Sequence, residues 1–168
     1  HMKCPEFNAI GLAFPGVPGF PHFGHNETVA WCITHGMADD TDLFVETEAL
    51  EAVEWEVEDL VIRGEGSFEV YRGSTPRGPV VLGDPSEGAA LSMAWTGMNG
   101  QDSTFDALLP MLKASTSEEL EAAVEPWVIP VNNLLSADRD GHISFKVRGR
   151  VIERPHAHRW IPVPAETS

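Results

Sequence analysis

Residues 14–46 read FPGVPGFPHFGHNETVAWCITHGMADDTDLFVE, which is a loop, an apolar run and an acidic turn in succession. In the loop, proline restricts the backbone while glycine permits sharp reversals. The apolar run at residues 28–34 is short, continuous and contains β-branched side chains, which predicts a strand that is buried on both faces. Because loops held on strands often carry binding and catalytic residues, we expect a functional site beside this strand.

The chain as a whole is acidic, with a formal net charge of −15 over 168 residues. Its length favours a single domain that spans residues 1–168. The charge makes phosphate backbones and anionic membranes poor partners, so nucleic-acid binding is excluded as a function class. No apolar run is long enough to span a membrane, and no signal peptide opens the sequence. His1 and Met2 are typical of the remnant of a cleaved expression tag, so we expect the chain to begin inside a longer reading frame.

Two cysteines, Cys4 and Cys32, allow one disulfide bond. Their number alone does not distinguish a disulfide from two small buried thiols. Both interpretations stay open, and export from the cytoplasm would favour the disulfide.

The hydrophobic pattern elsewhere predicts several more strands. We expect them at residues 7–14, 42–46, 53–58, 67–72, 78–83 and 89–95. Residues 53–58 alternate between apolar and acidic side chains, which is typical of a strand with one exposed face. Turn residues at 73–77 separate two of the expected strands.

Two helices and a hairpin are expected in the second half of the chain. Ser103 with Asp106, and Thr116 with Glu119, have the spacing of a capping box ahead of an apolar stripe. The stripes consist of Phe105, Leu108, Leu109 and Leu112 in the first helix and Leu120, Ala123, Val124 and Trp127 in the second. Residues 132–137 and 142–147 flank an Asp-Gly pair, which predicts a hairpin. The elements together predict an α+β fold, mostly of antiparallel strands, with two helices in the middle of the chain.

Several motifs then occur in a fixed order. Gly-His-Asn at 24–26 leads into the strand at 28–34 and the acidic turn, GPVV stands at 78–81, WVIPVNNLLSADRDG at 127–141, and PVP at 162–164. In this combination the chain resembles the penicillin acylase (penicillin amidase) family of N-terminal-nucleophile hydrolases, which also includes acyl-homoserine lactone acylases. One departure is that the histidine that usually precedes the Gly-Pro-Val-Val segment is absent. The resemblance implies that residues 1–168 are part of a four-layer αββα sandwich and an internal fragment of a catalytic chain.

The implied activity is hydrolysis of an acyl amide, of penicillin or acyl-homoserine lactone type. The family's nucleophile is an N-terminal Ser whose own α-amine acts as base, since that amine titrates near neutral pH. This Ser should lie several tens of residues before Gly24, whereas the chain has 23 residues there. We therefore expect the fragment to be inactive alone. Cys4 as an unmasked nucleophile is a weak alternative, because it lies too close to Gly24.

The resemblance assigns catalytic roles to three residues that the chain does contain. Asn133 matches the asparagine whose side chain donates a hydrogen bond to the oxyanion. His35 stands where the main-chain N–H supplies a second donor, so its imidazole need not act. Arg154 matches an arginine that orients the asparagine. The alternatives are an ordinary amide at a strand end for Asn133, a general base for His35 and a surface arginine for Arg154.

Substrate and metal contacts are implied as well. His22 and Phe23 fall where family members line the acyl pocket, although an aromatic residue alone is more often part of a core. Asp39 and Asp42, with the carbonyl of Thr41, offer the hard oxygens that suit a structural calcium ion. Further calcium ligands would come from outside the chain, and a solvated acidic turn is the alternative.

The implied partners are the remainder of the acylase polypeptide and a small acyl amide, with no nucleic acid and no membrane. The family suggests a periplasmic or secreted protein. We also expect the fragment to form a homo-oligomer, because a strand at 28–34 that is apolar on both faces would be left with open edges and uncovered surface. The rival hypothesis is a non-catalytic scaffold module that binds a ligand, calcium or a partner chain.

Overall fold

The computed structural model describes residues 1–17, 19–47, 53–83, 88–98, 100–154 and 160–165. They form two compact units, which are described separately below. Unit 1 comprises His1–Asp39 and Gly100–Val151, and unit 2 comprises Asp40–Asn99 and Ile152–Ser168. This division into units does not test the single domain expected over residues 1–168, which stays a prediction. Within the described ranges, no helix is both long and apolar enough to cross a membrane.

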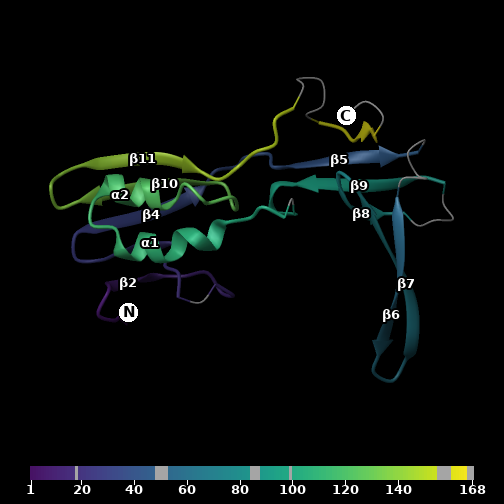
Figure 1. Ribbon diagram of the computed structural model, residues 1–168, viewed down its shortest axis with the longest axis horizontal. Coiled ribbons are helices and arrows are strands. Elements are labelled where there is room, and N and C mark those ends of the chain that lie inside the picture. The colour runs from purple at the N-terminus through teal and green to yellow at the C-terminus, as the bar shows by residue number, and fades with distance from the viewer. Residues whose placement is uncertain (18, 48–52, 84–87, 99, 155–159, 166–168) are drawn as a thin grey trace. The chain divides into compact units, whose positions relative to one another are not determined.

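Unit 1 is built on a sheet of six strands in the order β1-β2-β3-β4-β10-β11 (Figure 1). The strands are β1 (Met2–Lys3), β2 (Asn8–Leu12), β3 (Phe23–His25), β4 (Val29–His35), β10 (Asn132–Asp138) and β11 (Ile143–Arg148). Every pairing in this sheet is antiparallel. The apolar run that was expected to be a strand is β4, and it lies in the interior of the sheet between β3 and β10. The expected hairpin is formed by β10 and β11.

The helical segments of unit 1 are η3 (Thr104–Ala107), α1 (Leu108–Lys113) and α2 (Ser117–Ala123). The predicted cap of α2 is confirmed, because the Thr116 side chain accepts a hydrogen bond of 3.1 Å from the Glu119 main-chain N–H. The predicted cap by Ser103 is wrong. Its hydroxyl donates to the Pro126 carbonyl at 2.7 Å, and the segment begins as a 3-10 turn instead.

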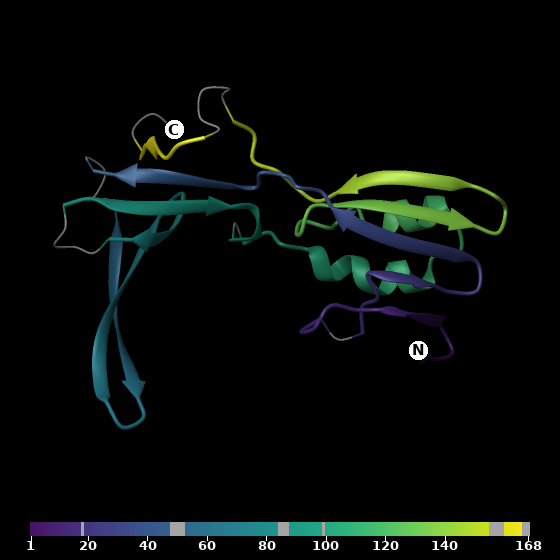
Figure 2. The same cartoon turned by 180° about the vertical axis from the view of Figure 1, so that it is seen from behind.

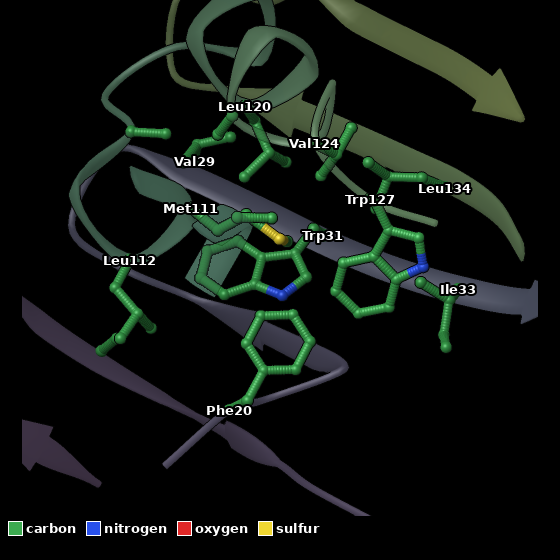
Figure 3. Close-up of a cluster of buried hydrophobic side chains, with 14 residues drawn as sticks. Phe20, Val29, Trp31, Ile33, Met111, Leu112, Leu120, Val124, Trp127 and Leu134 are labelled. Carbon is green, nitrogen blue, oxygen red and sulfur yellow. The ribbon is translucent and has the colours of Figure 1, made fainter. Parts of the chain in front are cut away.

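The core of unit 1 lies between these helices and one face of the sheet (Figures 1 and 3). Its members include Phe20, Trp31, Met111, Leu120, Trp127 and Leu134. The apolar stripe predicted for α2 is buried throughout. The stripe predicted for α1 is partly wrong, since Phe105 is 70% exposed and Leu109 is 49% exposed. The preceding 3-10 turn has three residues per turn rather than 3.6, which shifts the face that meets the sheet.

The prediction that β4 is buried on both faces is wrong. Its side chains alternate, with Val29, Trp31 and Ile33 buried, and with Ala30, Cys32 and Thr34 exposed on the opposite side. We call that opposite side of the sheet the outer face. It also presents large apolar side chains, namely Ile10, Leu12, Phe23, Leu135, Ile143, Phe145 and Val147. The outer face is therefore apolar although it is exposed among the described residues.

Unit 2 contains the second six-stranded sheet, in the order β12-β5-β9-β8-β7-β6. The strands are β5 (Thr41–Glu46), β6 (Glu54–Ile62), β7 (Gly66–Thr75), β8 (Gly78–Leu82), β9 (Ala90–Trp95) and β12 (Val163–Pro164), and a short 3-10 helix, η2 (Thr96–Met98), follows β9. Its pairings are antiparallel except for the parallel pair of β5 and β12. Mostly antiparallel strands with two α-helices in the middle of the chain confirm the predicted fold class.

A buried carboxylate stabilises the centre of unit 2. Glu46 at the end of β5 has no exposed surface, and it accepts hydrogen bonds from both Arg77 Nε and Arg77 Nη2, at 3.0 and 2.6 Å. The Ser92 hydroxyl donates a third bond of 2.6 Å. Two parallel bonds from one guanidinium, with a third donor, satisfy a charge that would be costly to bury alone.

Strands β6 and β7 form a two-stranded ribbon that extends beyond the other strands of unit 2 (Figure 2). The ribbon is longer than predicted, because β7 continues to Thr75 through part of the segment that was expected to be a turn. Val57, Leu60, Phe68 and Tyr71 are all about half exposed on it. A two-stranded ribbon is marginally stable in water by itself, and these apolar side chains are left without full burial on it.

Candidate active site

Asn133 projects from β10 onto the outer face of the unit 1 sheet. Its Nδ2 donates to Thr34 Oγ1 at 2.9 Å and, more weakly, to the His35 carbonyl at 3.4 Å. Thr34 is also its cross-strand partner in the β4–β10 ladder. The preceding residue, Asn132, points to the opposite side and is buried, because successive side chains on a strand alternate. Of these two asparagines, therefore, only Asn133 can donate to a ligand on the outer face.

A row of apolar side chains runs across the outer face beside Asn133. Leu135 lies opposite Cys32 on β4 and opposite Phe145 on β11. Phe23 begins β3 on the same side, because the next residue, Gly24, pairs with the buried Trp31 and a Cβ at Gly24 would point toward the Trp31 ring. A hydrogen-bond donor thus borders an apolar surface to which a hydrophobic acyl group could bind.

His35 ends β4 next to Asn133. Its imidazole Nδ1 accepts a hydrogen bond of 2.9 Å from the Met37 main-chain N–H, so in this contact Nδ1 carries no proton. The residue that donates has a positive φ of 51°, which turns the chain back toward the ring. The imidazole thereby stabilises the conformation of the loop that follows β4. The second oxyanion donor assigned to the His35 main chain stays a prediction.

His22 lies in the core of unit 1 and not in the row that contains Phe23. Only 4% of it is exposed, and its ring packs against Phe14, Phe20 and Trp127 at centroid distances of 4.5, 4.8 and 6.4 Å. Burial, with the nearby charge of Arg148, lowers the pKa of His22. The structure brings Phe23 to the outer face and leaves His22 beneath it as a neutral core residue, so the expected contact of His22 with an acyl chain stays a prediction.

Arg148 is a buried charged residue that the sequence pattern did not single out. It is buried at the end of β11, with its guanidinium 3.6 Å from the centre of the Trp127 ring. Its Nη2 donates to Asn132 Oδ1 at 3.2 Å, and burial lowers the pKa of Arg148 to about 10. The signal in the sequence is the inverted pattern of β11, whose apolar residues 143, 145 and 147 face outward while Ser144, Lys146 and Arg148 face the helices.

Arg154, in unit 2, binds the first residues of β5. Its Nε donates to Asp42 Oδ1 at 2.6 Å and its Nη2 donates to the Thr41 carbonyl at 3.3 Å. The expectation that Arg154 orients Asn133 stays a prediction, because Asn133 belongs to unit 1.

The same contacts bear on the implied calcium site. Calcium takes six to eight oxygen ligands, and two of the three oxygens expected from this chain already face a guanidinium. A divalent cation at Asp42 would also lie beside the positive charge of Arg154. In the described arrangement, Asp42 and Thr41 therefore do not fit a calcium ion.

A second acidic group occurs at the β10–β11 turn, where ligand atoms of Asp138, Asp140 and His142 lie within 4.8 Å of one another. The Asp138 side chain is only 2% exposed. Its carboxylate accepts main-chain hydrogen bonds from Ser117 at 3.0 Å, Asp140 at 3.1 Å and His142 at 3.0 Å. The bond from Ser117 first, and then the contacts with His142, lower the pKa of Asp138. The residue thus joins the turn to the start of α2, and a hairpin explains this group better than a metal site.

Comparison with known proteins identifies the family. A family model described as penicillin amidase matches residues 1–168. This chain belongs to the penicillin amidase family. It is 41% identical over 175 residues to the penicillin acylase 2 proenzyme of Pseudomonas sp. (strain SE83), covering 98% of this chain and 23% of that protein. It is also 23% identical to the acyl-homoserine lactone acylase QuiP of Pseudomonas aeruginosa, covering 98% of this chain and 22% of that protein.

A solved structure supports the same fold. The thermostable penicillin G acylase from Alcaligenes faecalis superposes with a TM-score of 0.83 at 23% identity, over 99% of this chain and 32% of that one. The predicted resemblance to penicillin amidases, and the fold class that it implied, are thereby confirmed. The chain spans about a quarter of the length of its curated relatives, which is consistent with a fragment of a larger amidase polypeptide.

Proposed function

We propose that this chain supplies the oxyanion side and part of the acyl-binding surface of an acyl-amide hydrolase. The observation that carries the proposal is the position of Asn133 beside the apolar row of Phe23, Leu135 and Phe145 on one face of the sheet. The substrate would be an amide of penicillin or acyl-homoserine lactone type. Its acyl group would lie on the apolar row and its carbonyl near Asn133.

Attack on the carbonyl carbon places negative charge on the carbonyl oxygen, and a carboxamide N–H can stabilise that charge without adding one of its own. In the free chain the Asn133 amide donates to Thr34 and to His35. The contact with the His35 carbonyl is long at 3.4 Å, so it is the weaker one and the one that an oxyanion would replace. Loss of one such donor typically costs about two to three orders of magnitude in rate.

The nucleophile would be an N-terminal Ser, with its α-amine as base, on a part of the polypeptide outside these 168 residues. The relatives support this, because the chain matches 23% of the penicillin acylase 2 proenzyme. The remaining polypeptide would also cover the apolar outer face. Without it, the 168-residue chain is expected to be inactive.

A chimera tests this proposal directly. The matching segment of the penicillin acylase 2 proenzyme is replaced by this chain, and hydrolysis of a chromogenic acyl anilide is measured for the chimera and for the isolated chain. We expect turnover by the chimera and none by the isolated chain. Turnover by the isolated chain that survives Cys4→Ala would contradict the assignment of the nucleophile. A chimera that folds and matures without activity would instead favour the non-catalytic module.

A further inference from the structure

In the acidic turn at the start of β5, oxygens of Asp40, Thr41 and Asp42 accept hydrogen bonds from donors in unit 2. Arg154 donates to the Asp42 carboxylate and to the Thr41 carbonyl, as described above. The Thr41 hydroxyl donates to Asp40 Oδ1 at 3.1 Å, and the Thr96 main-chain N–H donates to the Asp40 carbonyl at 3.3 Å. A turn that held a metal ion would have to aim several of these oxygens at one point, and here they are directed to protein donors.

We propose that Arg154 takes the place of a metal ion in this chain. Its guanidinium neutralises Asp42 and holds the segment after residue 151 against the start of β5. The turn would then require no calcium to keep its conformation. This inference concerns unit 2 alone and does not depend on the proposed hydrolase activity.

The geometry of the pair supports a strong contact. The Nε–Oδ1 distance of 2.6 Å is short for a bond between two charged groups. The side chains are only 11% and 15% exposed, so water and salt screen the pair much less than they screen a surface ion pair. A calcium ion at Asp42 would have to displace the guanidinium and leave it partly buried without its carboxylate, which is costly.

A second attachment lies near the same place on β5. Strand β12 pairs with it in parallel, with Val163 opposite Phe44 and Pro164 opposite Val45. Arg154 binds Thr41 and Asp42 at the beginning of that strand. Arg154 is thus attached to β5 by an ion pair and β12 by a two-residue ladder, and Arg154 performs the cross-linking that a bridging metal ion would provide.

The test uses the 168-residue chain and a double-mutant cycle of Arg154→Gln and Asp42→Asn. Thermal unfolding is followed in chelator and in millimolar calcium chloride, and calcium binding is measured by calorimetry. We expect each single substitution to lower the Tm by about 4 °C or more, and the double variant to be no less stable than the worse single one. Calcium should leave the Tm of the parent chain unchanged. Arg150→Gln is the control, since Arg150 is exposed and its guanidinium donates to the carbonyl oxygens of Glu125, at 2.9 Å, and Gly149, at 3.4 Å.

Three results would overturn the proposal. The first is a calcium-dependent rise in the Tm of the parent chain that Asp42→Asn abolishes, because the site would then be a metal site. The second is additivity of the two single substitutions, because the pair would then contribute nothing as a pair. Arg154→Lys is included because it keeps the charge and the fold but loses the forked geometry. It should give a Tm between those of the parent and Arg154→Gln, and a Tm equal to that of Arg154→Gln would also contradict the proposal.

Discussion

Asn133 donates a hydrogen bond of 2.9 Å to the Thr34 hydroxyl across the β4–β10 ladder, although 99 residues separate the two in sequence. The bond fixes the plane of the carboxamide, and therefore the direction of its N–H groups. A donor that is held in place before reaction stabilises an oxyanion better than a mobile one.

We therefore predict that Thr34→Val in the chimera lowers kcat about tenfold with little change in KM, because the Asn133 amide loses the bond that orients it. A tenfold fall corresponds to about 1.4 kcal/mol of lost transition-state stabilisation. Steady-state kinetics measure this effect. The matched control is Thr28→Val, which removes a hydroxyl bonded to Asn26 at 3.2 Å and should leave kcat unchanged. An unchanged kcat in Thr34→Val would show that the bond does not position Asn133.

The buried carboxylate of unit 2 leads to a prediction about stability. Glu46→Gln leaves the Arg77 guanidinium in its pocket without a negative partner, and breaking a buried pair typically costs about 3–5 kcal/mol. Urea unfolding should show this loss. The control is Glu56→Gln, whose salt bridge with Arg72 lies on the exposed ribbon, where such a pair contributes little because water and salt screen it. Equal losses in the two variants would contradict the assigned burial.

The lowered pKa of Asp138 leads to a prediction about the pH dependence of stability. Hydrogen bonds lower its pKa in the folded chain, so the unfolded chain binds the proton more tightly. The stabilisation by Asp138 is then fully present above the unfolded pKa of about 3.9 and is lost as the pH falls through the lower folded pKa. Asp138→Asn should consequently be less stable than the parent near neutral pH, and this difference should shrink in acid. A difference that does not vary with pH in urea unfolding curves would contradict the ionic role.

The apolar outer face predicts self-association of the isolated chain. Both edges of β4 are paired, so pairing at its edges is no longer the expected route. Contact between outer faces remains, and burying apolar surface contributes about 25 cal/mol per Å². Light scattering should show a species larger than a monomer, and Phe145→Ser should shift it toward the monomer. The control is Phe105→Ser, because Phe105 is exposed next to α1 and not on the outer face. A clean monomer across the micromolar range would refute the prediction.

Local patterns in the sequence predicted much of unit 1 but not the two faces of β4. The cap at Thr116 and the hairpin depend on residues within a few positions of each other, and both are confirmed. In β4, the exposed positions hold Ala30, Cys32 and Thr34, which are small enough to look like part of one continuous apolar run. The alternation of the strand was hidden for that reason.

The contacts that define the candidate sites join distant parts of the chain. Arg154 and Asp42 are 112 residues apart, and no local periodicity relates them. Arg148 was missed because a basic residue that ends an amphipathic strand is usually exposed, whereas here it lies against Trp127. Family resemblance indicated Asn133, and only the strand register showed that it shares a face with the apolar row.

The most direct test of the proposed function compares Asn133→Ala with the parent chimera in hydrolysis of a chromogenic acyl anilide. We predict that kcat falls by about two to three orders of magnitude while KM changes little, since Asn133 would bind the transition state more tightly than the substrate. Leu135→Ala is the matched comparison, and it should mainly raise KM because it removes part of the apolar row. A mature Asn133→Ala chimera that keeps the parent kcat would contradict the assignment of Asn133 to the oxyanion.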